Sequence, residues 1–106
     1  MLFDNITFMI ELTSKQRKIL EKAAHHLEPI IIVGQNGVTP ATAAQVSNAF
    51  KTHELLKVKF NEFKDDKREL AQWLSQETDS TMVRIIGNVL TLYRPFDDVE
   101  KREFKI

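Results

Sequence analysis

The chain has 106 residues and a formal net charge of zero, so its length suits one domain with a single hydrophobic core and its charge excludes a uniformly basic protein. Hydrophobic residues make up 42% of the chain and charged residues 28%, which is ordinary for a globular protein. The sequence contains no cysteine, which excludes a disulfide framework and a zinc site built on cysteine, and no apolar run approaches the roughly 20 residues that cross a bilayer.

The first element that the sequence predicts with a clear pattern is a helix. Residues 1–11 form a lead of uncertain structure, in which alternating apolar residues are compatible with a short strand or a docked arm. Thr13 or Ser14 can then cap a helix that runs to about Leu27, because apolar residues recur at a helical spacing. Its basic side chains lie largely off the apolar face, a pattern that is typical of a solvated helix surface.

A strand and a glycine turn follow this helix. Pro29 ends the helix, and the continuous apolar run over residues 30–33 predicts a strand that is buried on both faces or central in a sheet. The strand leads into the turn Gly-Gln-Asn-Gly at residues 34–37. After the turn, Thr39 is a good N-cap and Pro40 suits the first position of a second helix.

The Gly-x-x-Gly turn is the candidate binding element. Two residues without a Cβ let the backbone come close to a partner, and the first N–H groups of the following helix are expected to be unpaired at the positive end of its dipole. This arrangement favours an anion such as phosphate, although the same residues also suit a plain strand-to-helix connection. Residues 13–60, which include the turn, carry seven basic and three acidic side chains, a net charge of +4, against −2 for residues 1–12 and −2 for residues 61–106.

The remaining pattern alternates between strands and helices. A helix over about residues 40–53 is followed by a strand over residues 55–60, whose alternation places Lys57 and Lys59 on one face. That face is either a solubilising surface or a surface that contacts phosphate. The last predicted elements are a helix over about residues 64–78, strands over about residues 82–86 and 89–93 with a two-residue turn between them, and a charged, loosely held tail.

This order of elements predicts an α/β fold. Strand–helix–strand units usually give parallel pairing, and the final hairpin adds an antiparallel pair. We therefore expect a two-layer α-β-α-β-α-β-β arrangement with a four-stranded mixed sheet. The predicted organisation is a lead over residues 1–11, one domain over residues 12–96 and a charged tail over residues 97–106.

No catalytic or metal-binding motif occurs in the sequence. The three histidines lie in no H-E-x-x-H pattern, and neither a phosphate-binding P-loop, nor G-x-G-x-x-G, nor G-x-S-x-G is found. The sequence therefore predicts a protein that is not an enzyme, with no catalytic residue, metal or cofactor.

Several blocks of the sequence together resemble a known family. They are Leu12-Thr13 with Gln16-Arg17, Val33-Gly34 with Asn36-Gly37-Val38-Thr39, His53-Glu54-Leu55, and Leu92-Tyr93-Arg94-Pro95. In combination they resemble the CRM domain family (chloroplast RNA splicing and ribosome maturation), specifically its bacterial stand-alone members of the YhbY type. The resemblance implies a fold like the C-terminal domain of translation initiation factor three.

The resemblance also implies a function. It implies RNA binding, with the Gly-x-x-Gly loop holding the nucleic-acid backbone as in KH domains, and ribosomal RNA of the large-subunit precursor as the partner. Specificity is expected to come from RNA shape, because few exposed aromatic residues are expected. The predicted RNA-binding residues are Arg17, Lys18, Gly34, Gln35, Asn36, Gly37, Thr39, Lys57, Lys59 and Arg94.

Two other functions stay open at this point. The basic surface can dock acidic proteins, which would make the chain a protein-interaction adaptor. A small enzyme acting on a phosphorylated ligand would need a deep polar pocket near Gly34. A location in the cytoplasm is expected because the N-terminus lacks a secretory signal pattern. Further expectations are a monomer, with neither a membrane nor DNA as a partner.

Overall fold

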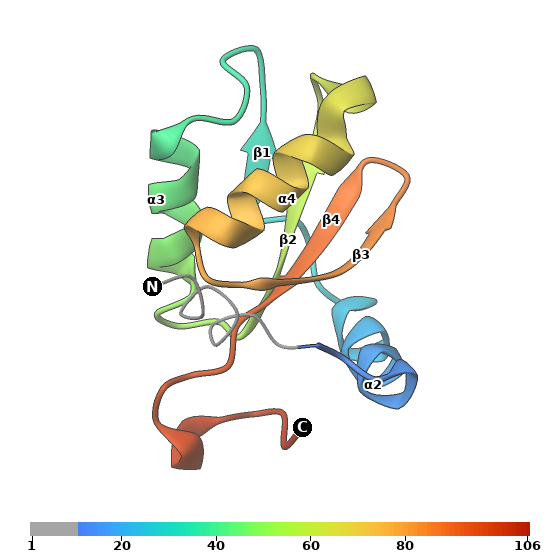
Figure 1. Ribbon diagram of the computed structural model, residues 1–106, viewed down its shortest axis with the longest axis vertical. Coiled ribbons are helices and arrows are strands. Elements are labelled where there is room, and N and C mark those ends of the chain that lie inside the picture. Colours follow the sequence, from blue (N-terminus) through green and yellow to red (C-terminus); the bar gives the residue numbers. More distant parts are fainter. Residues whose placement is uncertain (1–10) are drawn as a thin grey trace.

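The computed structural model describes residues 11–106, and the predicted N-terminal lead lies outside this range except for its last residue. Figure 1 shows a central sheet with helices around it. None of the described helices is long and apolar enough to cross a membrane. The elements are α2 (Ser14–Ala24), β1 (Ile31–Val33), α3 (Pro40–Ala49), β2 (Leu55–Phe60), the 3₁₀ helix η1 (Lys64–Asp66), α4 (Lys67–Glu77), β3 (Thr81–Ile86), β4 (Val89–Tyr93) and the 3₁₀ helix η2 (Val99–Lys101).

The sheet has the strand order β1-β2-β4-β3. β1 pairs with β2 in parallel, whereas the pairs β2–β4 and β3–β4 are antiparallel. The predicted α/β class, the order of elements and the four-stranded mixed sheet are therefore confirmed. Helices α2 and α3 end earlier than predicted, at Ala24 and Ala49, because just beyond them the N–H groups of Leu27, Lys51 and Thr52 bond to carbonyls only three residues back and form turns.

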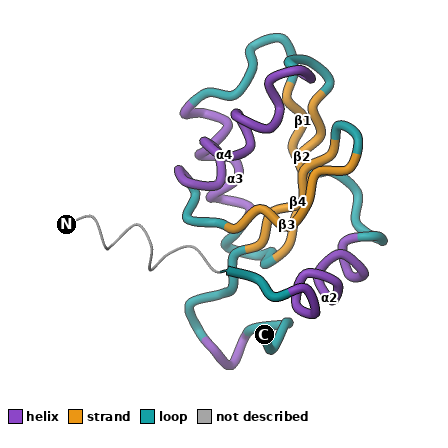
Figure 2. Tube along the Cα trace, turned by 45° about the vertical axis from the view of Figure 1, so that its right-hand side comes forward, coloured by secondary structure: helices purple, strands orange, loops and turns teal. Residues whose placement is uncertain are grey.

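The main core lies between the sheet and helices α3 and α4, which cover one face (Figure 2). Val46 on α3 and Leu74 on α4 are fully buried in this core. On β2 the alternate residues Leu56, Val58 and Phe60 face it, as the sequence pattern predicts. Burying one such side chain stabilises the fold by about 1.5–3 kcal/mol. Because this core holds more buried side chains than the opposite face, it contributes most of the apolar stabilisation.

Helix α2 packs on the opposite face of the sheet and covers only part of it (Figure 2). Its predicted cap is confirmed, because the Thr13 hydroxyl accepts from the Gln16 N–H while the Gln16 side chain accepts from the Thr13 N–H. Leu20 and Ala24 are buried against Leu55 of β2. α2 therefore adds a partial third layer and leaves the remainder of its sheet face open.

β1 differs from the prediction made for it. The continuous apolar run predicts burial on both faces, but β1 is an edge strand that pairs only with β2 among the described strands. Ile31 and Val33 are buried, whereas Ile30 and Ile32 are 50% and 51% exposed. The prediction was wrong because α2 does not cover this part of the sheet, a feature that the apolar run itself does not encode.

The C-terminal tail is held against the domain rather than loose. The buried Glu54 carboxylate accepts hydrogen bonds from the backbone N–H groups of Phe96 (2.9 Å), Glu103 (2.6 Å) and Phe104 (3.4 Å). The Phe104 ring packs edge-on against Tyr93. Burial, and then the nearby Glu54 carboxylate, raises the pKa of Tyr93. The expected loose tail was wrong because main-chain N–H groups, which composition does not reveal, make these bonds.

Candidate nucleic-acid interface

The Gly-x-x-Gly loop links β1 to α3 at one end of the sheet, at the top of Figure 1. The Gly37 N–H donates to the Gly34 carbonyl oxygen at 3.0 Å, which closes the turn. The Thr42 hydroxyl donates to the Gly37 carbonyl oxygen at 3.4 Å and ties the loop to α3. Gln35 and Asn36 lie exposed at the tip. The loop is therefore a fixed turn with an accessible outer surface.

The two glycines of the loop differ in what the fold requires of them. Gly37 has a φ of +72°, in the left-handed region, and a Cβ there would lie 3.2 Å from Cε2 of Phe63. Gly34 does not have a positive φ, and a Cβ there would meet no atom within 4 Å. Gly37 thus has a structural reason to be glycine, whereas the described structure provides none for Gly34.

The start of α3 is more fully paired than the sequence predicts. Thr39 and Thr42 bond reciprocally, because each hydroxyl accepts from the other residue's N–H, at 3.1 and 3.4 Å. Pro40 has no N–H to offer. The expectation of several free amides at the helix start was therefore wrong, since a second threonine completes the cap. The N–H groups of the loop and of the helix start that donate to no partner within residues 11–106 include those of Gln35, Asn36, Val38 and Ala41.

Lys59 lies on the open part of the sheet beside the loop. Directly paired residues of neighbouring strands project from the same face, so Ile32, Lys59, Val89 and Ile86 form one row across the sheet. Ile32 is two residues before Gly34, which places this row at the loop end of the sheet. Ile32 and Ile86 are 51% and 64% exposed, so the row is not covered by α2. We call it the open row.

Lys57 lies in the next row of the same face, one pleat away from Lys59, and is tied to the segment after α2. Its ammonium group donates to the Leu27 carbonyl oxygen at 3.1 Å. In the same row Arg84 forms a salt bridge with Glu21 of α2, with 2.8 Å between nitrogen and oxygen. The side chain of Lys57 therefore adjoins the open row but already has one partner.

Arg17 and Lys18 lie on α2, and Arg17 contacts β3, the edge strand opposite β1. The Arg17 guanidinium donates to the carbonyl oxygens of Met82, at 3.2 Å, and of Val83, where β3 bulges. Arg17 thereby holds α2 on β3, which is a structural role that its charge alone does not predict. The Lys18 side chain is exposed and makes no hydrogen bond within the part of the chain that the structure describes.

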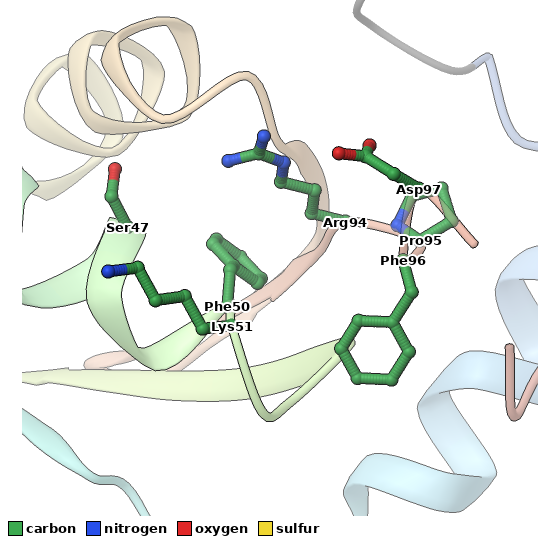
Figure 3. Close-up of a pocket in the computed structure, with 7 residues that line it drawn as sticks. All are labelled: Ser47, Phe50, Lys51, Arg94, Pro95, Phe96 and Asp97. Atoms are coloured by element: carbon green, nitrogen blue, oxygen red, sulfur yellow. The ribbon is translucent and has the colours of Figure 1, made fainter. Parts of the chain in front are cut away.

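Arg94 lies at the other end of the sheet from the loop. It follows the end of β4, which pairs with the start of β2, whereas the loop adjoins the end of β2. Arg94 donates to the Thr78 carbonyl oxygen at 3.3 Å and lines a separate pocket of about 410 Å³. Figure 3 shows the side chains of Arg94 and Lys51 extending toward Ser47 in this pocket.

The predicted RNA-binding residues therefore lie in three separate places. The first is the loop with the two lysines of β2, the second is the pair of residues on α2, and the third is Arg94.

Phe63 is a neighbour of the loop that the sequence pattern does not predict. It follows β2 and has a φ of 58°, in the left-handed region. This region favours glycine, asparagine and aspartate, so nothing in the sequence marks Phe63 for it. Lys67, which follows this segment, joins it to the turn between β3 and β4. Its ammonium group donates to the Gly87 carbonyl oxygen at 2.6 Å and to Oδ1 of Asn88 at 3.2 Å. Three connections, over residues 34–39, 61–66 and 87–88, thus meet at this end of the sheet.

The loop at this end of the sheet offers donors that suit an anion. Among residues 11–106, no group of three or more His, Asp or Glu side chains could hold a metal ion. The raised pKa of Tyr93 belongs to the far end of the sheet, beneath the C-terminal tail. The loop itself offers unpartnered N–H groups and a glycine surface, with the ammonium group of Lys59 beside it, whereas the carboxylates at this end belong to the connection over residues 61–66.

Known proteins are similar to this chain in sequence and in fold. A sequence model described as the CRS1/YhbY (CRM) domain matches residues 12–94. A Haemophilus influenzae protein named an RNA-binding protein is 37% identical over 93 residues, which cover 87% of this chain and 94% of that protein. A Bacillus subtilis protein named a probable RNA-binding protein is 38% identical over 84 residues, covering 78% of this chain and 88% of that protein. The solution structure of a Staphylococcus aureus protein, described as a candidate RNA-binding protein, has a TM-score of 0.72 at 35% identity and covers 89% of this chain and 99% of that one.

Proposed function

We propose, because this chain belongs to the CRS1/YhbY (CRM) domain family, that it binds RNA and that the loop over residues 34–37 is the centre of the contact. The resemblance noted from the sequence blocks is confirmed by the family match. The names of the bacterial relatives support RNA as the ligand. The contact is proposed to be non-enzymatic, because the unpartnered N–H groups of the loop and the ammonium group of Lys59 suit the binding of an anion.

One observation carries the proposal: Gly34 is a glycine that the fold does not require. A side chain there would meet no atom within 4 Å, and the backbone has no positive φ. The missing Cβ therefore serves the approach of something outside the chain. A phosphate group fits this position, because the adjacent N–H groups of Gln35 and Asn36 have no partner among the described residues and can donate to its oxygens.

From the loop, the RNA backbone is proposed to follow the open row toward Lys59 and then Lys57. Lys59 is exposed and directly available, whereas Lys57 must share its ammonium group with the Leu27 carbonyl oxygen. Lys18 extends the positive surface from α2. Arg17 contributes the guanidinium N–H groups that do not bond to the carbonyl oxygens of β3. Arg94 is proposed as a separate contact that only a longer RNA would reach.

The proposed ligand is ribosomal RNA of the large-subunit precursor, as the family resemblance implies, and the chain is proposed to bind it as a monomer in the cytoplasm. Crosslinking of the protein to RNA in cells, followed by sequencing of the attached fragments, tests this identity. Enrichment of large-subunit ribosomal RNA is expected. Enrichment of messenger RNA alone would contradict the ribosomal role while leaving the RNA contact intact.

Replacing Lys59 with glutamine is expected to reduce the salt dependence of RNA binding. Each phosphate contact contributes about 0.7–0.9 to the slope of log affinity against log salt concentration. Lys59→Gln should lower the slope by about that amount, and its melting temperature should not change because the side chain is exposed. Fluorescence anisotropy with a structured ribosomal RNA fragment measures the slope. Lys101→Gln, in η2 at the far end, is the matched control, and an equal slope in the two variants would remove Lys59 from the contact.

The open row also favours a second function, an adaptor that docks an acidic protein. Ile32 and Ile86 are 51% and 64% exposed in the same row as Lys59, and apolar groups beside a cation suit a protein partner. The double variant Ile32→Ser, Ile86→Ser separates the two functions. An adaptor would lose its captured protein, whereas an RNA contact centred on the loop would keep its affinity.

A further inference from the structure

Phe63 combines an unfavourable backbone with an exposed aromatic ring. Its φ of 58° lies in the left-handed region, which is rare for a bulky side chain. Within residues 11–106 the other non-glycine residue with positive φ is Asp79, a residue type that this region tolerates. The Phe63 side chain is 44% exposed to solvent. A strained backbone that presents an exposed ring, instead of burying it, points to a binding role for the ring.

The strained backbone holds the ring beside the Gly-x-x-Gly loop. The N–H groups of Asn61 and Glu62 both donate to the Val33 carbonyl oxygen, at 3.0 and 3.2 Å, which ties this segment to the end of β1. One edge of the Phe63 ring borders Gly37, because a Cβ there would lie 3.2 Å from Cε2 of the ring. The exposed part of the ring is therefore a direct neighbour of the unpartnered N–H groups of the loop.

The charge around the ring differs from that around the loop. The ring borders a hollow of about 500 Å³ that carries three carboxylates and one ammonium group. Carboxylates repel phosphate, so this hollow does not suit the RNA backbone. A nucleobase is neutral, can stack on an aromatic ring and can direct its N–H groups toward carboxylates. The charged residues of the hollow are Glu62, Lys64, Asp65 and Asp66.

We propose that Phe63 stacks on an unpaired RNA base whose strand is held by its phosphate at the adjacent loop, so that the chain selects unpaired segments of RNA over duplex. This inference rests on the proposed RNA contact at residues 34–37. Bases inside a duplex are already stacked on their neighbours and offer no free face, whereas loops and bulges do. Loss of one base–aromatic stack weakens binding by about 5- to 100-fold.

The test compares two RNA probes with the full chain. One is a hairpin with 2-aminopurine placed at each unpaired loop position in turn, and the other is the fully paired duplex of the same stem. Phe63→Asn removes the ring and suits the left-handed backbone, so its melting temperature should equal or exceed that of the unchanged chain. It should bind the hairpin about 5- to 100-fold more weakly, lose the quenching of 2-aminopurine and keep its duplex affinity.

Phe63→Trp should retain both the hairpin affinity and the quenching, since its ring also stacks. Val99→Asn removes an exposed apolar side chain from η2, at the end of the sheet away from the loop, and should change neither the hairpin affinity nor the quenching. Unchanged hairpin affinity and quenching in Phe63→Asn would overturn the inference while upholding the proposed function. Equal weakening of hairpin and duplex would also overturn it. Failure of the unchanged chain to bind either probe at low salt would instead overturn the proposed function itself.

Discussion

Gly34→Asp is expected to bind RNA at least tenfold more weakly than the unchanged chain while it folds normally. The added side chain has open space and an ordinary backbone, so the fold can accept it. Its carboxylate would stand where the phosphate is proposed to lie. Two like charges about 4 Å apart repel by about 1 kcal/mol even at the dielectric constant of water. Obstruction of the neighbouring N–H groups adds to this, and about 1.4 kcal/mol already corresponds to tenfold.

The measurement is RNA affinity by anisotropy together with a thermal melt of the same samples. The asparagine side chain of Gly34→Asn has nearly the same shape as aspartate but no charge. This variant should therefore show a smaller loss of RNA affinity, which separates electrostatic repulsion from obstruction. Gln72→Asp adds the same charge to the exposed surface of α4 and should leave affinity unchanged. If folded Gly34→Asp binds RNA as tightly as the unchanged chain, the loop is not the site.

Glu54→Ala is expected to lower the free energy of unfolding by about 2–4 kcal/mol. The Glu54 carboxylate is 2% exposed and accepts the backbone N–H groups of Phe96, Glu103 and Phe104. Without it, these donors lose a charged acceptor, and the tail can satisfy them only by moving into water. That movement would uncover the core around Tyr93, on which Phe104 packs.

Denaturant unfolding measures this loss, and limited proteolysis reports whether residues 97–106 are released. RNA affinity at a temperature where the variant stays folded should not change, because Glu54 lies at the far end of the sheet from the loop. Glu100→Ala removes an exposed carboxylate from the same tail and should have little effect. Equal stability of the Glu54 and Glu100 variants would show that the buried carboxylate does not hold the tail.

The parts of the fold that the sequence predicts correctly are those set by local periodicity. β2 and β4 have the predicted bounds because their alternation and the Gly87-Asn88 turn are local signals. The caps at Thr13 and Thr39 are likewise encoded within a few residues. The same holds for the Gly-x-x-Gly turn, whose closing bond joins residues three apart.

The parts that could not be predicted depend on contacts between distant segments. Ile32, the middle residue of β1, and the preceding Ile30 are about half exposed because α2 lies elsewhere on the sheet, which an apolar run does not encode. Arg94 and the loop belong to opposite ends of the sheet, because β4 runs against β2. The placement of Phe63 beside Gly37 depends on a left-handed residue that no sequence preference marks. Nothing in the sequence distinguishes the buried Glu54 from the other charged residues, which make up 28% of the chain.

The central claim is that RNA phosphate is held by the unpartnered amides of the loop, next to Lys59. A titration of ¹⁵N-labelled protein with a hairpin of ribosomal RNA, followed by amide resonances, tests it most directly. The account predicts that the amide signals of Gln35, Asn36, Val38 and Ala41 move first and furthest, while those next to Arg94 move only with longer RNA. Shifts gathered around Arg94 and Lys51, with the loop amides unchanged, would contradict it.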